Sequence, residues 1–143
     1  MTSLLFDVNV ILDVLLDRWP HVEAAAALWE MVERGRAKGY LPAHGVTTIH
    51  CLIRRERGPA FAAKAMTDLL RVFDVAPVNA DVLKAAVALR MKDFEDAVCA
   101  QSAAAVGCDL LVSRNPSGYR GSPVPILSPG EAVARLRARA PRE

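Results

Sequence analysis

The sequence lacks the features that mark membrane proteins and disulfide- or zinc-stabilised proteins. No apolar run reaches membrane-spanning length, and no basic segment leads into a long apolar stretch near the amino terminus. The three cysteines, Cys51, Cys99 and Cys108, are odd in number and form no CxxC pair, which argues against a disulfide framework and a thiolate zinc site. Each lies among apolar or small residues, so we expect three reduced core thiols in a cytoplasmic protein.

Extremes of charge and composition are also absent. The formal net charge is +2, which by itself does not indicate a nucleic-acid partner. Internal repeats and low-complexity linkers are not found. Hydrophobic residues make up 52% and charged residues 24% of the 143 residues, which is typical of a globular chain. We therefore expect a single domain over residues 1–143, with a frayed tail over about residues 138–143.

Strand-like and helix-like stretches alternate along the chain. Apolar and β-branched runs predict strands over Ser3 to Phe6, Gly39 to Ala43, Val72 to Val78, Cys108 to Ser113 and Val124 to Leu127. Helical spacing and capping residues predict helices over Val10 to Leu16, His21 to Arg34, Val46 to Arg57 and Ala60 to Arg71, then after Asn79 or Asp81, from Asp93 to Ala105, and after Ser128. This alternation indicates an α/β fold with a parallel sheet and helices on both faces.

Polar residues gather where these elements begin or end. Asp7 and Asn9 follow the first strand. Ser113, Arg114 and Asn115 end or follow the fourth strand, and Asp93, Glu95 and Asp96 open the helix before it. If the first and fourth strands are neighbours, these side chains meet at one edge of the sheet, where α/β proteins bind ligands. Carboxylates brought together repel unless a cation intervenes, and oxygen donors suit Mg²⁺ or Mn²⁺.

Simpler roles exist for several of these residues. Asp7 is either a turn residue at a strand end or a cation ligand. Asp93 is either the N-cap of its helix, with Asp96 in the first turn, or a further ligand. Asn115 precedes a proline and is common in turns. The pattern of residues alone leaves these alternatives open.

Two segments together resemble the PIN-domain family, and in particular its bacterial VapC-like toxin ribonucleases. They are LLFDVNVILDVLL and, about ninety residues later, DFEDAVCAQSAAAVGCDLLVSRNPSGYRGSPVPILSP. The resemblance extends from Leu4 to about Val133. It implies a three-layer α/β/α sandwich with a central, mostly parallel sheet. It also implies an endoribonuclease site that uses Mg²⁺ or Mn²⁺, with RNA as substrate.

The resemblance also implies roles for individual residues. Asp7 and Asp96 match acids that hold the metal ion. Asp93 matches no family acid, but it is a candidate third metal ligand that would restore some of the negative charge lost at other positions. Asn9 matches the amide beside the first acid, Ser113 takes the place of the Thr or Ser that holds the geometry of the catalytic site, and Asn115 stands where many relatives carry the last acid. Relatives commonly form homodimers, and those that are toxins are inhibited by an antitoxin protein.

The sequence departs from the family pattern at two acid positions. Thr48 stands where an acid is usual, with His50 nearby as a proton shuttle or a half-buried helix residue, and Asn115 replaces the last acid. This depleted set leaves a second hypothesis, a weak or inactive PIN-fold module that binds RNA or a protein. A phosphatase of the haloacid dehalogenase type is disfavoured, because it needs an aspartate where Asn9 stands.

Arginines offer candidate contacts for an RNA backbone. Arg114 and Arg120 flank the expected site, and we predict that Arg114 binds a phosphate group. Arg54 belongs to a basic cluster with Arg55 and Arg57, and we predict a substrate contact there as well, although Glu56 inside the cluster fits an ordinary solvated surface.

Overall fold

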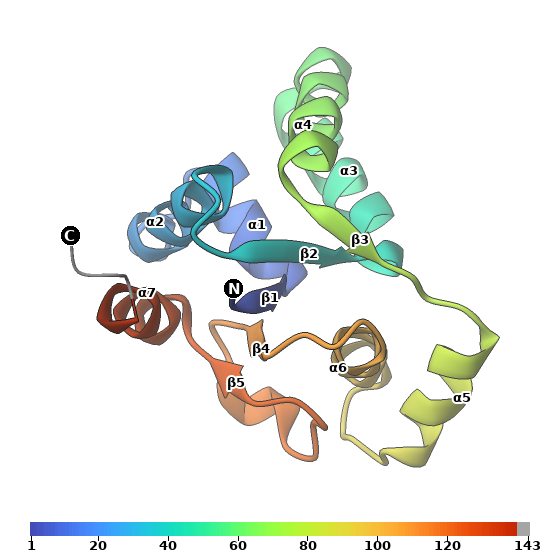
Figure 1. Ribbon diagram of the computed structural model, residues 1–143. Helices are drawn as coiled ribbons and strands as arrows, with labels where there is room; N and C mark the ends of the chain where they lie inside the picture. Colours follow the sequence, from blue (N-terminus) through green and yellow to red (C-terminus); the bar gives the residue numbers. More distant parts are fainter. Residues whose placement is uncertain (140–143) are drawn as a thin grey trace.

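The computed structural model describes residues 1–139, in which strands and helices alternate (Figure 1). The strands are β1 (Ser3–Phe6), β2 (Lys38–Pro42), β3 (Asp74–Ala76), β4 (Leu110–Val112) and β5 (Ile126–Leu127). The helices are α1 (Val8–Leu15), α2 (Val22–Glu33), α3 (Ala43–Arg57), α4 (Pro59–Val72), α5 (Ala80–Ala88), α6 (Phe94–Ala105) and α7 (Pro129–Ala138), with a 3₁₀ turn η1 (Pro116–Tyr119). The frayed tail expected over residues 138–143 lies, beyond its first two residues, outside the described part.

The five strands form one sheet in the order β3-β2-β1-β4-β5, and every strand pair is parallel. The first strand, β1, lies in the centre, with Leu4 paired to Gly39 of β2 on one side and to Leu110 of β4 on the other. The chain moves outward from β1 through β2 and β3, then crosses back to β4. The order therefore reverses between β1 and β4, where open α/β sheets bind ligands.

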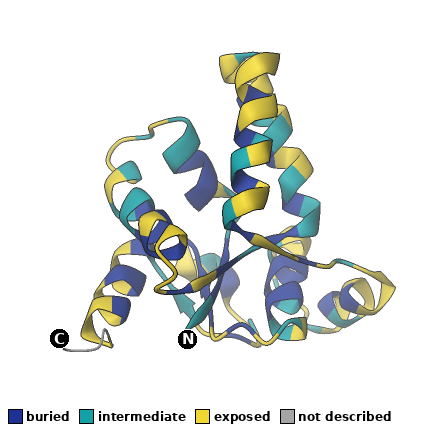
Figure 2. Cartoon of the chain, turned by 45° about the horizontal axis from the view of Figure 1, so that its top comes forward, coloured by how far each residue is buried: buried dark blue, intermediate teal, exposed yellow. Residues whose placement is uncertain are grey.

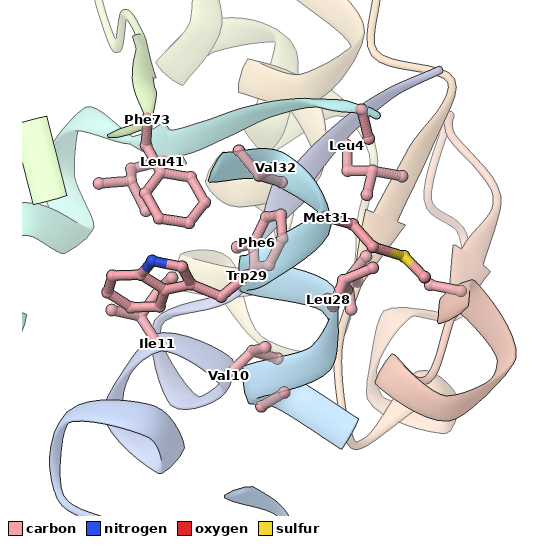
Figure 3. Packing of buried hydrophobic residues seen from close by; sticks show 14 of the residues in the cluster. Leu4, Phe6, Val10, Ile11, Leu28, Trp29, Met31, Val32, Leu41 and Phe73 are labelled. Carbon is pink, nitrogen blue, oxygen red and sulfur yellow. The ribbon is translucent and has the colours of Figure 1, made fainter. Parts of the chain in front are cut away.

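Side chains of β1 alternate between the two faces of the sheet, as the two-residue period of a strand requires. Leu4 and Phe6 belong to a core cluster built with α1, α2 and α7, whereas Leu5 belongs to a second cluster built with α6. Figure 3 shows the first cluster, in which Phe73 meets both Phe6 and Trp29 edge to face, with ring centroids 5.0 and 5.1 Å apart. Helices thus cover both faces, and the predicted α/β/α sandwich is confirmed.

Helix caps agree with the sequence, but some boundaries do not. Asn79, rather than Asp81, caps α5, and Ser128 forms a capping box with Glu131 at α7. The strand predicted over Val72 to Val78 is shorter, because the preceding helix continues to Val72 and leaves only Asp74–Ala76 in the sheet. Helix α3 begins at Ala43 rather than Val46, directly after β2.

The cysteine prediction was wrong in part. Cys99 and Cys108 are buried free thiols, as expected, but Cys51 is exposed on α3. Cys51 lies on the outer face of α3, because Ile49 and Ile53 are fully buried on the opposite face of this helix. Helices α3 and α4 form a hairpin that projects from the sheet, and Figure 2 shows mostly exposed residues at its far end. Among residues 1–139, no helix combines the length and apolarity required to cross a membrane.

Candidate active site

Asp7 stands where β1 ends and α1 begins, at the carboxyl edge of the sheet. Its backbone N–H donates to the Val112 carbonyl of β4 (2.9 Å), which ties the two strand ends together. Asp7 occupies the N-cap position of α1, yet its carboxylate accepts no capping hydrogen bond. The carboxylate is therefore not needed by the helix, and this favours the ligand role over the turn role.

The Ser113 side chain, just after β4, links the ends of β4 and β1 through a hydrogen bond to Asp7. Its side chain is almost fully buried, and its hydroxyl donates to Asp7 Oδ2 over 3.1 Å. The Ser113 hydroxyl oxygen in turn accepts the backbone N–H of Asn115 at 3.1 Å, and the Asn115 side-chain oxygen accepts from the Ser117 hydroxyl at 3.0 Å. Ser113 thus orients the Asp7 carboxylate and shapes the loop after β4.

Asp96 reaches the same place from the first turn of α6. Asp93 caps this helix, since its Oδ1 accepts the Asp96 N–H at 2.9 Å, so the capping role predicted for Asp93 is confirmed. Burial, with the Asp93 and Asp7 carboxylates nearby, raises the pKa of Asp96 to about 6. The negative charges around Asp96 are thus poorly compensated by the protein itself.

A pocket of about 290 Å³ brings the predicted residues together. Its lining contains Asp7, Asn9, Asp96, Ser113, Arg114, Asn115 and Tyr119. All five residues predicted to be catalytic therefore line one cavity, together with the predicted phosphate ligand Arg114. Asp93 does not belong to this lining. Arg54 lines a separate surface hollow on the α3–α4 hairpin, with His50, Cys51, Arg55 and Pro59.

Sequence reasoning missed two buried polar residues at this site. The Tyr119 ring lines the pocket at 3% exposure. Its hydroxyl is close enough to the Asp96 carboxyl to lower the pKa of Asp96, but it meets hydrogen-bond geometry with no atom of the described residues. Asp13 is fully buried on α1, beneath Arg114. A lone carboxylate in the apolar face of α1 was the signal that could have revealed it.

The histidines and Thr48 lie apart from the pocket lining. Thr48 is exposed on α3, and His50 is half-buried, as one of its two predicted roles requires. His44, in the first turn of α3, has a buried Nδ1 with no hydrogen-bond partner in residues 1–139. Burial lowers the pKa of His44, while Glu95 and Asp7 oppose that shift, so this ring lies in the electrostatic field of the site.

The donor set suits a hard divalent cation. Carboxylate oxygens of Asp7 and Asp96, with hydroxyl and amide oxygens of Ser113, Asn9 and Asn115, are ligands that Mg²⁺ and Mn²⁺ accept. Burial and the neighbouring carboxylates together raise the pKa of Asp96, and a cation would offset both effects. Only two carboxylates line the pocket, and residues 1–139 contain no group of three or more His, Cys, Asp or Glu side chains placed for a metal ion.

The chain resembles known proteins over most of its length. It matches the family described as PIN domain over residues 3–117. No curated protein matches it. VapC20 of Mycobacterium tuberculosis, a Sarcin-Ricin loop cleaving toxin, superposes with a TM-score of 0.62 at 20% identity, covering 76% of this chain and 87% of that one.

Two further solved structures share the fold. VapBC2 from Rickettsia felis, bound to a DNA fragment from its promoter, gives a TM-score of 0.71 at 11% identity, covering 89% of this chain and 98% of that one. FitAcB from Neisseria gonorrhoeae gives a TM-score of 0.63 at 14% identity, covering 88% of this chain and 97% of that one. At these identities the likeness concerns the fold.

Proposed function

Because the chain belongs to the PIN domain family, we propose that it is a Mg²⁺- or Mn²⁺-dependent endoribonuclease that hydrolyses phosphodiester bonds of RNA. One observation carries the proposal: Asp7 and Asp96, from separate parts of the sequence, line one pocket with Asn9, Ser113 and Asn115. The pocket lies at the switch point of the sheet, and its oxygen donors are those that such an ion prefers.

Each residue has a defined task in this proposal. Asp7 and Asp96 hold the cation, which when bound supplies Lewis acidity and a water molecule that ionises near neutral pH. Ser113 keeps the Asp7 carboxylate in one orientation through its 3.1 Å hydrogen bond. Arg114, whose side chain is 31% exposed, binds a phosphate oxygen of the substrate at the pocket wall.

Asn9 and Asn115 complete the pocket. Asn9 is exposed at the start of α1, and its amide can donate to a phosphate oxygen or turn its carbonyl toward the cation. Ser117 holds the Asn115 side chain, because its hydroxyl donates a hydrogen bond to the side-chain oxygen of Asn115. The amide nitrogen of Asn115 therefore points away from Ser117. The amides bring no negative charge, so electrostatic binding of the ion depends on the two aspartates.

The test compares the parent with Asp7→Asn on single-stranded RNA, in excess Mg²⁺ or Mn²⁺ and in a chelator. We expect the parent to cut only with metal, and Asp7→Asn to lose at least about a hundredfold in rate, as for a lost charge-stabilising group. A Glu56→Gln variant, altered at an exposed acid of α3, should cut like the parent. A parent that cuts no RNA with either ion would refute the nuclease proposal.

We further propose that the protein is the toxin of a type II toxin–antitoxin pair and forms a homodimer. The support is the fold shared with VapC20, VapBC2 and FitAcB. The 84% exposure of Trp19 adds a large apolar side chain to the surface available to a partner. Expression should arrest growth, and co-expression of the adjacent reading frame should restore it, while sedimentation should give twice the monomer mass.

A second function is favoured by the small acid set. With two carboxylates in the pocket and an exposed Thr48 on α3, the chain could bind RNA or a protein partner without cutting. This alternative predicts RNA binding in a chelator, no cleavage with any divalent ion, and growth effects that survive Asp7→Asn. The nuclease predicts that Asp7→Asn abolishes both cleavage and growth arrest.

A further inference from the structure

A second hollow lies beside the active-site pocket and carries only positive charge. We name it the basic groove; it has a volume of about 570 Å³, and its lining includes Arg90, Lys92, Ser117, Gly118, Arg120 and Gly121. No acidic residue lines it. None of its three cations forms an ion pair within residues 1–139, and all three are exposed.

Two distant loops build the basic groove. Arg90 and Lys92 come from the connection between α5 and α6, whereas Arg120 and Gly121 follow η1. These loops touch: a Cβ atom at Gly121 would lie 3.4 Å from Met91 Cγ and 3.9 Å from the Leu89 carbonyl oxygen. Packing of one loop on the other therefore places cations from both on a single surface.

The wall of the groove is also the wall of the active site. A Cβ atom at Gly118, which lines the groove, would lie 2.9 Å from Asn115 Nδ2 and 3.7 Å from Asp96 Oδ2. Those two side chains line the active-site pocket. A strand whose scissile phosphate lies in the active-site pocket would thus have its neighbouring phosphates within reach of the groove.

Arg90 occupies a backbone position at a helix end where glycine is the favoured residue. It follows the C-cap of α5 with a φ of +54°, the left-handed conformation that glycine adopts most cheaply at a helix end. Its N–H bonds to the Val87 carbonyl at 3.3 Å, so the turn closes the helix in the usual way. An arginine here costs about 1 kcal/mol of backbone strain relative to glycine, and its side chain makes no ion pair within residues 1–139 that would offset the cost.

We propose that the basic groove binds the phosphodiester backbone of the RNA strand flanking the scissile bond, through Arg90, Lys92 and Arg120. The inference rests on the proposed ribonuclease function for its choice of ligand. It extends that function by assigning the path of the strand, which leaves the pocket past Gly118 rather than toward Arg54 on the α3–α4 hairpin. Contacts of this kind bind any sequence and weaken with salt.

The test measures binding of a labelled single-stranded RNA of mixed sequence in a chelator, over a series of salt concentrations, so that cleavage plays no part. The variants are Arg90→Gly, which suits the left-handed backbone and should unfold no more easily than the parent, and Arg120→Ala. The control is Arg36→Ala. This exposed arginine lies just before β2, at the amino-terminal ends of the strands, whereas the active-site pocket lies at their carboxyl-terminal ends.

We expect each groove variant to lower the slope of log affinity against log salt by about 0.7, which at about 0.1 M salt is about a fivefold loss in affinity. Arg36→Ala should match the parent. Equal losses in the groove variants and the control, no loss in either groove variant, or a parent that binds no RNA would each overturn the proposal. A parent that binds through the groove but never cuts would refute only the nuclease function.

Discussion

The Asp13 carboxylate lies 3.5 Å from Nε of Arg114, and its other oxygen lies 3.8 Å from Arg18. Asp13 is fully buried, and neither oxygen of its carboxylate accepts a hydrogen bond within residues 1–139. Burial raises the pKa of Asp13, and the Arg114 charge opposes that shift. This pairing uses Nε and leaves the two terminal nitrogens of Arg114 available at the pocket.

Removing Arg114 should therefore expose the cost of the buried carboxylate. Without its main partner the pKa of Asp13 rises further above the unfolded value, so stability is lost as pH increases. We expect Arg114→Ala to lower the free energy of unfolding by about 2 kcal/mol at about pH 8 and by less near pH 5. Denaturant unfolding at both pH values measures this.

The matched control is the double variant Asp13→Asn with Arg114→Ala. A neutral amide at position 13 needs no cation, so the double variant should lose less than the sum of the two single changes. Additive losses would show that the two side chains do not interact in solution.

Ser113 should matter through its hydroxyl alone. Ser113→Ala removes the donor to Asp7 and the acceptor for the Asn115 N–H, which should lower the unfolding free energy by about 1–2 kcal/mol. Cleavage should fall about tenfold or more, as for other residues that orient a ligand. Ser113→Thr keeps the hydroxyl and should retain most of the rate; if both variants lose equally, the hydrogen bond is not the cause.

For Tyr119 we expect removal of the hydroxyl to stabilise the protein, whereas removal of the Ser113 hydroxyl should destabilise it. Its hydroxyl is buried without a partner in the described residues, so Tyr119→Phe should stabilise the metal-free protein by about 1 kcal/mol. Thermal unfolding in a chelator provides the measurement, and clear destabilisation would contradict the prediction.

Asp96 makes stability depend on pH in the metal-free protein. Its pKa is about 6 in the folded chain, above the usual aspartate value of 3.8, so the folded state holds the proton more tightly. The stability that this proton contributes is complete below about pH 4 and is lost as pH rises through about 6. Asp96→Asn should therefore unfold less easily than the parent at about pH 8, by about 1 kcal/mol after allowance for solvent screening.

The two proteins should converge below about pH 3, where the parent carboxyl is protonated in both the folded and the unfolded state. Urea unfolding in a chelator at several pH values gives the comparison. A constant difference between the parent and Asp96→Asn across this range would mean that Asp96 does not titrate as described.

Metal binding should stabilise the parent and not the aspartate variants. At a free Mn²⁺ concentration about a hundredfold above the dissociation constant, the gain is about 2.7 kcal/mol. We expect Mn²⁺ to raise the Tm of the parent and of Glu56→Gln and to leave the Tm of Asp7→Asn nearly unchanged. Addition of a chelator should abolish the rise in Tm. An equal rise in all three proteins would indicate non-specific binding.

Much of the site followed from residue order. A parallel sheet brings strand ends to one edge, so Asp7 and Ser113 could be expected to meet once β1 and β4 were taken as neighbours. Asp93 as a cap and Asp96 in the first turn followed from local helix chemistry. The place of Arg54 did not follow in this way: it lines a hollow separate from the pocket, because α3 and α4 project from the sheet, and its predicted substrate contact stays a prediction.

The sequence by itself determined the elements, the α/β class and most of the pocket residues, since hydrophobic periods, caps and strand exits are local properties. Tertiary structure alone decided which polar side chains lost contact with water. Asp13 and Arg114 lie about a hundred residues apart, and only the packing of α1 beneath the loop after β4 turns them into a buried pair. The basic groove has the same origin, because its cations belong to loops that meet only in the folded chain.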